Sequence, residues 1–383
     1  MQETLDYLYG LTRFGMKLGL EVVSSLLDKL DHPEKKFKSI HIAGTNGKGS
    51  VSAYLNSILQ EVGYKVGMYT SPHLIKFNER IKVNDKEISD EELVKLTKVI
   101  REKGTEATFF EFTTALAFQY FAEQEVDFVI AETGMGGRLD ATNVLEPLVS
   151  VITNISFDHQ KHLGDTIEKI AYEKACIIKE NSQVVVNVGE EVLGVFKKKC
   201  EEMKAELFIA EDKEVETSLL GGYQQENADT AIKTAKLLGV DNEVIKIGIA
   251  KTKWPGRLEF ISKNILVDCA HNLAGMRRLV EFVAKLEKRK VLVIGIADDK
   301  EIAEMVRVIA PLFEKVIITQ GNYKPALTSV IAKEVKKYVN DVKEIVDVKE
   351  AIEEAKNSVN DEELILVCGS IYLVGDILAK ISV

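Results

Sequence analysis

The chain has 383 residues, too many for one ordinary hydrophobic core, so we expect two domains. Hydrophobic residues make up 46% and charged residues 29%, which is typical of a globular protein, and the net charge of -10 argues against a nucleic-acid partner. The N-terminus lacks the apolar core of a signal peptide and no run of roughly 18 apolar residues exists, so we expect a cytoplasmic protein without a membrane segment.

In the first part of the chain, short β-branched runs alternate with helical patterns, which is typical of βα units around a parallel sheet. Two helix starts carry capping-box signals, Ser89 with Glu92 and Asp165 with Glu168. The predicted strands cover residues 37–43, 65–70, 127–132, 148–155 and 183–188, and the last predicted helices cover 225–238 and 242–251. These patterns predict a doubly wound α/β domain over residues 1–254.

A second βα series follows the Trp254-Pro255-Gly256 break. Its predicted strands cover residues 264–269, 290–296, 315–319, 342–346 and 363–368, with helices starting near 273, 299, 328, 348 and 371. The sequence therefore predicts a smaller, five-stranded Rossmann-like α/β domain over residues 255–383.

A glycine-rich loop, GTNGKGS at residues 44–50, separates the first strand from a helix predicted over 51–60. Glycines let backbone N–H groups converge on phosphate oxygens, and the helix N-terminus and a lysine add positive charge. The spacing departs from the usual P-loop pattern, and a plain strand-to-helix turn is the alternative. We predict a P-loop ATP-binding domain in which the nucleotide phosphates are bound by Gly44, Thr45, Asn46, Gly47, Lys48, Gly49 and Ser50.

Two further side chains follow predicted strands, Glu132 and His159. Parallel sheets bind ligands at the carboxyl ends of their strands, so both residues can share one crevice with the glycine-rich loop. Carboxylate oxygens suit Mg²⁺, and one imidazole is tolerated in a mixed site. Each residue taken singly also has a purely structural alternative: Glu132 as a solvated or ion-paired carboxylate, and His159 as a hydrogen-bonded loop histidine.

Several segments together carry a resemblance to a known family. They are GTNGKGS at 44–50, TSPHL with NERI across 70–81, EKACI at 173–177, PGRLE at 255–259, DCAHN at 268–272 and GSIYLVG at 369–375. This set resembles the folylpolyglutamate and dihydrofolate synthases, the folate branch of the Mur ligase superfamily. The resemblance covers nearly the whole chain, and the combination of segments is highly specific.

The resemblance implies ATP and Mg²⁺ as cofactors, with Ser71, Glu132 and His159 as metal ligands. It also implies that Lys174 can be carbamylated, which would turn an amine into an additional carboxylate-like ligand. An unmodified, exposed helix lysine is the alternative for Lys174.

Nucleotide contacts from the second part of the chain are also implied. Arg257 would reach the ATP phosphates, Asp268 and His271 the ribose and phosphate, and Asn227 the adenine. A surface arginine is the alternative for Arg257. For Asp268 and His271 the alternative is a purely structural strand end, because Cys269 and Leu273 replace the family's usual Gly and Pro.

For the substrates, the resemblance implies a loop that closes over nucleotide and folate, a pterin site like that of bifunctional enzymes, and a site for glutamate. A plain core aromatic residue is the alternative for Phe110. The implied residues are Pro72 and His73 for the loop, Thr108, Phe110, Asp140 and Ala141 for the pterin, and Ser370 and Tyr372 for glutamate.

The activity implied is ATP-dependent addition of L-glutamate to tetrahydrofolate through an acyl phosphate. A bifunctional enzyme would also add glutamate to dihydropteroate; the residues resembling a pterin site favour this dual activity, and the monofunctional enzyme stays open as the alternative. Lys48, Lys174, Arg257 and His271 are the implied catalytic residues of a monomeric enzyme with small-molecule partners only. Two further alternatives stay open. One is a Mur-type ligase acting on a non-folate acid, and the other is a P-loop regulator that binds nucleotide and signals by conformation.

Overall fold

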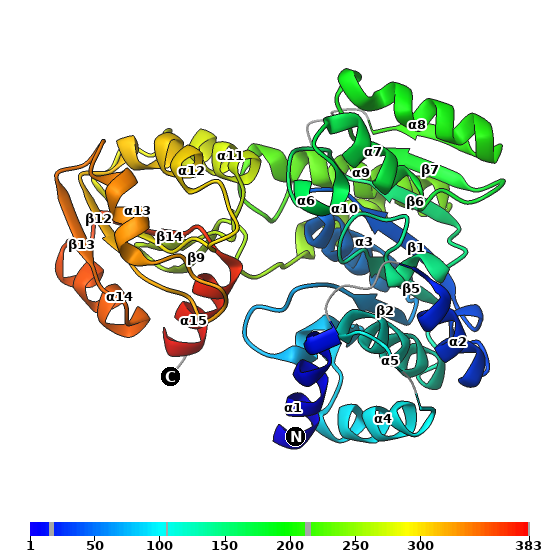
Figure 1. The fold of residues 1–383 in the computed structure, drawn as a ribbon. Helices are drawn as coiled ribbons and strands as arrows, with labels where there is room; N and C mark the ends of the chain where they lie inside the picture. The colour runs from blue at the N-terminus through cyan, green and yellow to red at the C-terminus, as the bar shows by residue number, and fades with distance from the viewer. Residues whose placement is uncertain (15–18, 105, 211–215, 382–383) are drawn as a thin grey trace. The chain divides into compact units, whose positions relative to one another are not determined.

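The computed structural model describes residues 1–14, 19–104, 106–210 and 216–381. It divides into two compact units, coloured blue to green and yellow to red over most of their length in Figure 1. Unit 1 is Met1–Ser218 with Gln225–Thr252, and unit 2 is Leu219–Gln224 with Lys253–Val383. Among the helices of the described residues, none has the length and apolar character needed to cross a membrane.

Unit 1 is built on a sheet of eight strands in its described residues, in the order β4-β3-β2-β5-β1-β6-β7-β8. The six strands from β2 to β8 in that order are parallel, and β3 and β4 add an antiparallel hairpin at one edge. Their bounds are β1 Lys38–Ala43, β2 Val66–Tyr69, β3 Ile81–Val83, β4 Lys86–Glu87, β5 Phe128–Glu132, β6 Val149–Ile152, β7 Gln183–Val186 and β8 Glu206–Ile209.

Helices around this sheet pack together in groups, which include α3 with α10, α5 with α2 and α4, and α7 with α8. The closest approach is at Gly248, where a Cβ atom would lie 2.6 Å from Ile58 Cα, so only glycine permits α10 to pack this tightly on α3. The helices are α1 Gln2–Gly10, α2 Glu21–Lys29, α3 Lys48–Val62, α4 Asp90–Glu102, α5 Phe109–Glu123, α6 Gln160–Leu163, α7 Ile167–Ala175, α8 Glu190–Met203, α9 Gly222–Leu237 and α10 Asn242–Lys251.

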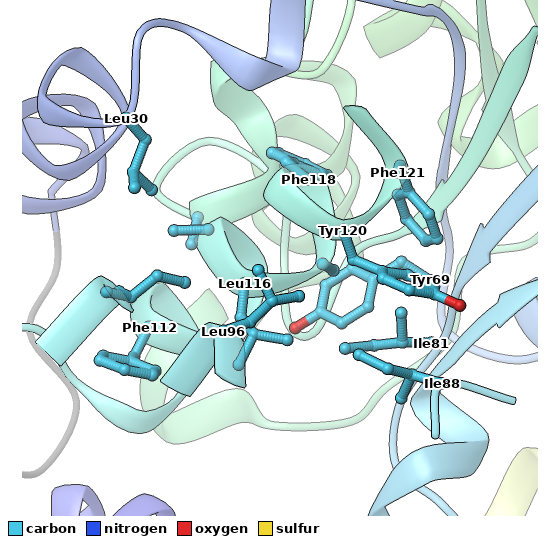
Figure 2. Close-up of a cluster of buried hydrophobic side chains, with 14 of the residues drawn as sticks. Leu30, Tyr69, Ile81, Ile88, Leu96, Phe112, Leu116, Phe118, Tyr120 and Phe121 are labelled. Atoms are coloured by element: carbon cyan, nitrogen blue, oxygen red, sulfur yellow. The ribbon is translucent and has the colours of Figure 1, made fainter. Parts of the chain in front are cut away.

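The largest aromatic cluster of unit 1 lies where α4 and α5 cover β2 and β3. Figure 2 shows Leu96 from α4, Phe112 and Phe118 from α5, and Tyr69 and Ile81 from the strands, all buried. Burying one such side chain contributes about 2 kcal/mol. This apolar layer fixes the strands whose carboxyl ends carry the candidate site.

Unit 2 has a sheet of six strands in its described residues, in the order β13-β12-β11-β14-β10-β9, of which only β9 runs antiparallel to its neighbour. Helices α11, α12 and α13 lie on one face, and α14 and α15 on the other (Figure 1). The bounds are β9 Glu259–Ser262, β10 Ile265–Val267, α11 Leu273–Val283, β11 Lys290–Ile294, α12 Ile302–Ile309, β12 Lys315–Ile318, α13 Thr328–Val335, β13 Asp341–Glu344, α14 Val348–Asn357, β14 Leu364–Cys368 and α15 Ile371–Ile381.

The predicted α/β fold class is confirmed, with two local corrections. The structure adds strands β3, β4, β8 and β9, so unit 2 has six strands and not five. The cap of α7 is Thr166, whose hydroxyl accepts from Lys169 N, and not Asp165, whose carboxylate instead pairs with the Lys169 ammonium. The capping box at Ser89 and Glu92 is confirmed.

Candidate active site

The glycine-rich loop runs from β1 into α3. Helix α3 begins at Lys48, three residues earlier than predicted, because Gly47 adopts a left-handed conformation with φ of +84° and acts as the N-cap. A side chain on Gly47 would also collide with Asn227 of α9, since a Cβ atom would lie 2.3 Å from Asn227 Oδ1. The structure thus brings the predicted Asn227 against the loop, next to a helix N-terminus suited to anions.

Hydrogen bonds fasten the loop to the segment that follows β6. Thr45 N donates to Asn154 O over 2.8 Å, and Asn46 N donates to Asn154 Oδ1 over 3.0 Å. Thr153 Oγ1 donates to Asn46 O over 2.6 Å, and Ser156 N donates to Thr45 Oγ1 over 3.0 Å. Because β1 and β6 are adjacent, two neighbouring strands determine the conformation of one loop.

Three predicted residues meet at the carboxyl ends of β1, β5 and β2. Lys48 Nζ lies 3.7 Å from Glu132 Oε1 and donates to Thr45 O over 3.3 Å. Ser71 N donates to Glu132 Oε2 over 3.3 Å, so the serine lies beside a carboxylate whose side chain is only 7% exposed. A cation, a carboxylate and a serine from three strands therefore form one cluster.

Lys174 reaches the same loop from α7. Its residue is 4% exposed, and Nζ donates to Gly44 O over 2.7 Å. Burial, with the nearby Lys48 charge, lowers the pKa of Lys174 to about 7, although Asp158 and Asp140 oppose the shift. The exposed-lysine alternative is therefore wrong, and a substantial fraction of this amine is neutral near pH 7.

His159 follows β6 at the same edge of the sheet and is the most accessible of the predicted ligands. It has a φ of +50° at the start of α6, its side chain is 42% exposed, and Nε2 lies 3.9 Å from Asp158 Oδ1. In the described part of the chain, no three His, Cys, Asp or Glu side chains form a ready-made metal site. A mixed set of the Ser71 hydroxyl, the Glu132 carboxylate and ATP phosphates nevertheless suits Mg²⁺, which prefers hard oxygens and binds through substrate phosphates.

Pro72 and His73 lie in the loop after β2, Pro72 exposed and His73 half-buried. Arg80 Nε donates to His73 Nδ1 over 2.8 Å, and the Arg80 guanidinium lies 5.4 Å from the Phe109 ring centroid. Burial and the Arg80 charge lower the pKa of His73 to about 4. His73 is therefore neutral at pH 7, with its remaining proton on Nε2.

The predicted pterin residues lie around the start of α5 and the loop after β5. Thr108 caps α5 by accepting from Glu111 N, and the Phe110 ring stacks on Tyr69 at 6.0 Å and 27°. The Asp140 carboxylate accepts from Met135 N over 2.9 Å, and the adjacent Ala141 is buried. Thr108 and Asp140 thus have local structural roles, and Phe110 is a half-buried ring.

In unit 2, Asp268 and His271 follow β10. The buried Asp268 carboxylate accepts from Leu258 N, Ala270 N and Tyr223 Oη, over 2.9, 2.8 and 3.2 Å. His271 Nδ1 lies 2.9 Å from Cys269 O, which requires a proton on Nδ1 and leaves Nε2 as the second ring position.

Arg257, Ser370 and Tyr372 complete the predicted set in unit 2. Arg257 is half-buried, and its charge acts on Asp268. Ser370 Oγ accepts from Tyr372 N over 3.2 Å, and the Tyr372 ring lies 4.6 Å from the ring of Tyr323. Ser370 and Tyr372, the two residues predicted to bind the substrate glutamate, therefore contact each other at the start of α15.

Four residues with clear contacts were not singled out from the sequence. Asn154 and Asp158 follow a predicted strand end and could have been found from that position alone, because strand ends form the ligand edge of a parallel sheet. Arg80 and Tyr223 act through tertiary hydrogen bonds, which leave no local pattern.

Comparisons with known proteins identify the family of the chain. The Mur ligase middle domain matches residues 42–270, and the Mur ligase glutamate ligase domain matches residues 256–371. The dihydrofolate synthase/folylpolyglutamate synthase of Bacillus subtilis is 37% identical, over 100% of this chain and 99% of the relative.

Two solved structures are similar over almost the whole chain. Escherichia coli FolC in complex with DHPP and ADP has a TM-score of 0.90 and 28% identity, over 99% of this chain and 97% of that one. The bifunctional folylpolyglutamate synthase/dihydrofolate synthase of Yersinia pestis, with Mn, AMPPNP and L-glutamate bound, has a TM-score of 0.89 and 27% identity, over 99% and 98%. The chain belongs to the folylpolyglutamate synthase/dihydrofolate synthase family of the Mur ligase superfamily, the ATP- and Mg²⁺-dependent ligases that join glutamate to folates.

Proposed function

We propose that this chain adds L-glutamate to tetrahydrofolate and also to dihydropteroate, with both substrates activated at the carboxyl edge of the unit 1 sheet. One observation carries the proposal. Lys48, Glu132 and Ser71 converge there from three strands, with Lys48 Nζ 3.7 Å from Glu132 Oε1 and Ser71 N 3.3 Å from Glu132 Oε2. A cation and a metal-binding carboxylate in contact, beside a helix N-terminus, suit a triphosphate and its metal.

The proposed chemistry has two steps. A substrate carboxylate oxygen attacks the γ-phosphorus of ATP, the bond to the β-γ bridging oxygen breaks, and ADP leaves an acyl phosphate behind. The glutamate amine then attacks the acyl carbon, releasing phosphate and a proton and forming an amide. In this proposal Lys48 and Arg257 stabilise charge on the transferring group and His271 contacts the phosphate, so the chain itself supplies position and charge.

Ser71, Glu132 and His159 would hold Mg²⁺, which when bound neutralises charge on the phosphate oxygens. Lys174 would add a carbamate: its neutral amine attacks CO₂, forms an N–C bond and releases one proton. Its burial and lowered pKa support this role, since only the neutral amine is nucleophilic.

The remaining proposed roles follow the family's pattern. Asn227 contacts adenine, Asp268 with His271 contacts ribose and phosphate, and Ser370 with Tyr372 orients glutamate. The pterin acid would be bound by Pro72, His73, Thr108, Phe110, Asp140 and Ala141. We also propose functional domains at residues 1–254 and 255–383, a monomer, and a cytoplasmic location.

Two findings support the dual activity. The Bacillus subtilis relative carries both activities in its name, and the Escherichia coli structure holds DHPP with ADP.

The test is an ADP-release assay with Mg²⁺-ATP, L-glutamate and either dihydropteroate or tetrahydrofolate, with product masses measured. We expect ADP release that depends on all three substrates and a product heavier by one glutamyl unit in both cases. A mass increase with tetrahydrofolate alone would refute the dual activity. ADP release that ignores both pterins would refute the folate assignment.

A further inference from the structure

The turn that carries Arg257 is held by two hydrogen bonds of the Gly256 backbone, one through its N–H group and one through its carbonyl oxygen. Gly256 N donates to Glu259 Oε2 over 2.7 Å, and Cys269 N donates to Gly256 O over 3.0 Å. Leu258, the next residue, is buried and has a φ of +45°, a conformation that non-glycine residues rarely adopt. Such a conformation persists only where its surroundings enforce it.

Asp268 provides that enforcement. Its Oδ2 atom accepts both from Leu258 N, over 2.9 Å, and from Tyr223 Oη, over 3.2 Å. Its Oδ1 atom accepts from Ala270 N over 2.8 Å, which ties the carboxylate to the end of β10. One buried oxygen of the Asp268 carboxylate therefore joins the strained residue of the Arg257 turn to a tyrosine that lies 45 residues before Asp268 in the chain.

Tyr223 lies in residues 219–224, the short segment that belongs to unit 2 although the chain on either side of it belongs to unit 1. This segment packs directly on the turn, because a Cβ atom on Gly221 would lie 2.6 Å from Leu258 Cδ1. Burial raises the pKa of Tyr223, so its hydroxyl stays protonated and donates to the carboxylate. The Arg257 charge acts on Tyr223 and Asp268, and Arg257 Nη1 donates to Gly256 O over 3.3 Å.

We infer that Tyr223 is a positioning residue: through Asp268 it holds Leu258 in its strained conformation and so directs Arg257 toward the transferring phosphoryl group. The inference rests on the proposed role of Arg257. This role of Tyr223, at the start of α9, is separate from the roles proposed for the glycine-rich loop and the metal-binding residues. A displacement of about 1 Å at a catalytic group can lower a rate about a hundredfold. Loss of one of the three donors to Asp268 should therefore have a smaller effect.

The test is Tyr223→Phe, which removes only the hydroxyl, in the glutamate-addition assay. We expect kcat/KM for ATP to fall about tenfold, while KM for the pterin and for glutamate stays within about twofold. Tyr338→Phe, an exposed tyrosine of the same unit, is the matched control and should leave all constants unchanged. Unchanged ATP kinetics in Tyr223→Phe, or a loss that appears only as a higher KM for the pterin or for glutamate, would overturn the inference.

A double-mutant cycle separates positioning from general structural support. In an Arg257→Ala background, Tyr223→Phe should have no further effect on kcat/KM, because the residue it positions is gone. The same tenfold loss in both backgrounds would contradict an action through Arg257.

Hydrogen exchange gives a readout that does not depend on activity. The Leu258 amide, which donates to Asp268, should exchange about tenfold faster in Tyr223→Phe than in the wild type. Unchanged exchange at Leu258 would overturn the inference even in an inactive protein. An inactive wild type with faster exchange in the variant would instead refute only the proposed function.

Discussion

The two units fix their charged residues by different means. In unit 1, Glu132 ends β5, and Lys48 begins α3, which the glycine-rich loop joins to the adjacent parallel strand β1. In unit 2, Arg257 sits on a turn whose conformation depends on Asp268 and Tyr223. At the carboxyl ends of the parallel strands, backbone pairing between strands positions the charged residues. The Arg257 turn instead depends on a buried carboxylate that accepts several hydrogen bonds.

This difference has a consequence for stability. A charge at a sheet edge can be removed with little harm to the fold, since strand pairing does not depend on it. Removing Asp268 leaves Leu258 N and Ala270 N without their acceptor inside the protein, and unsatisfied buried donors destabilise. We therefore expect unit 1 variants to lose activity alone and Asp268 variants to lose activity and stability together.

The largest effect is expected for Lys48→Ala. Loss of the only charge that the loop itself directs at the phosphates should lower kcat about a thousandfold, comparable to removing a transition-state donor. Steady-state ADP release measures this, and Lys98→Ala, an exposed lysine on α4, is the control. A loss below about tenfold would contradict the comparison, because the Lys48 charge at the carboxyl ends of the unit 1 strands would then contribute little to kcat.

Lys174→Met should lower kcat about a hundredfold, since the side chain fills the same space without an amine. It should also raise the unfolding midpoint, because burying an amine whose pKa falls to about 7 is unfavourable. The unfolded state binds the extra proton between about pH 7 and 10.5, so this penalty is complete below pH 7 and is lost as the pH rises to 10.5. Thermal scans in CO₂-free buffer at pH 6 and 9 should show a larger gain at pH 6, and a destabilised variant would refute this.

Asp268→Asn should lower kcat/KM for ATP about thirtyfold and the free energy of unfolding by about 2 kcal/mol. An amide presents one oxygen and one NH₂ group, so it cannot accept from Leu258 N and Ala270 N with both of its ends. Denaturant titration checks the stability, with Asp361→Asn, an exposed residue, as the control. Lost activity at full stability would indicate that Asp268 acts only by touching ribose.

The smallest effect on activity is expected for His41, which is buried in β1 with Nε2 2.7 Å from Thr142 Oγ1. Burial, with the Lys179 charge, lowers its pKa to about 3 from 6.5. Between these two pKa values His41 is protonated in the unfolded chain and neutral in the folded protein. The free energy of unfolding therefore falls as the pH drops from about 6.5 toward 3, by up to about 1.4 kcal/mol per pH unit. Unfolding of His41→Gln should depend less on pH in this range; an identical acid dependence would show that His41 is not responsible.

Much of the fold was predictable because βα units alternate regularly and the central strands are continuous apolar runs. The strands that escaped prediction are short or lie at edges: β4 has two residues, and β8 pairs only with β7 and is partly exposed. Such strands lack the buried, β-branched pattern that a sequence reveals. The start of α3 was missed because it depends on the left-handed conformation of Gly47.

The candidate site divides in the same way as the two units. Lys48, Ser71 and Glu132 were predicted from strand ends and motifs, and the structure brings them together. The contact between Tyr223 and Asp268 spans 45 residues and joins a helix start to a strand end. No periodicity or spacing encodes it, so only the tertiary structure reveals it.

The most direct test of the account uses a pterin acid whose reacting carboxylate carries ¹⁸O at both oxygens. If the γ-phosphoryl group of ATP is transferred to that carboxylate at the unit 1 site, the released phosphate must contain one labelled oxygen for each glutamyl unit added. Mass spectrometry of phosphate and product gives both quantities in one reaction. Released phosphate without label, alongside a glutamylated product, would contradict the account.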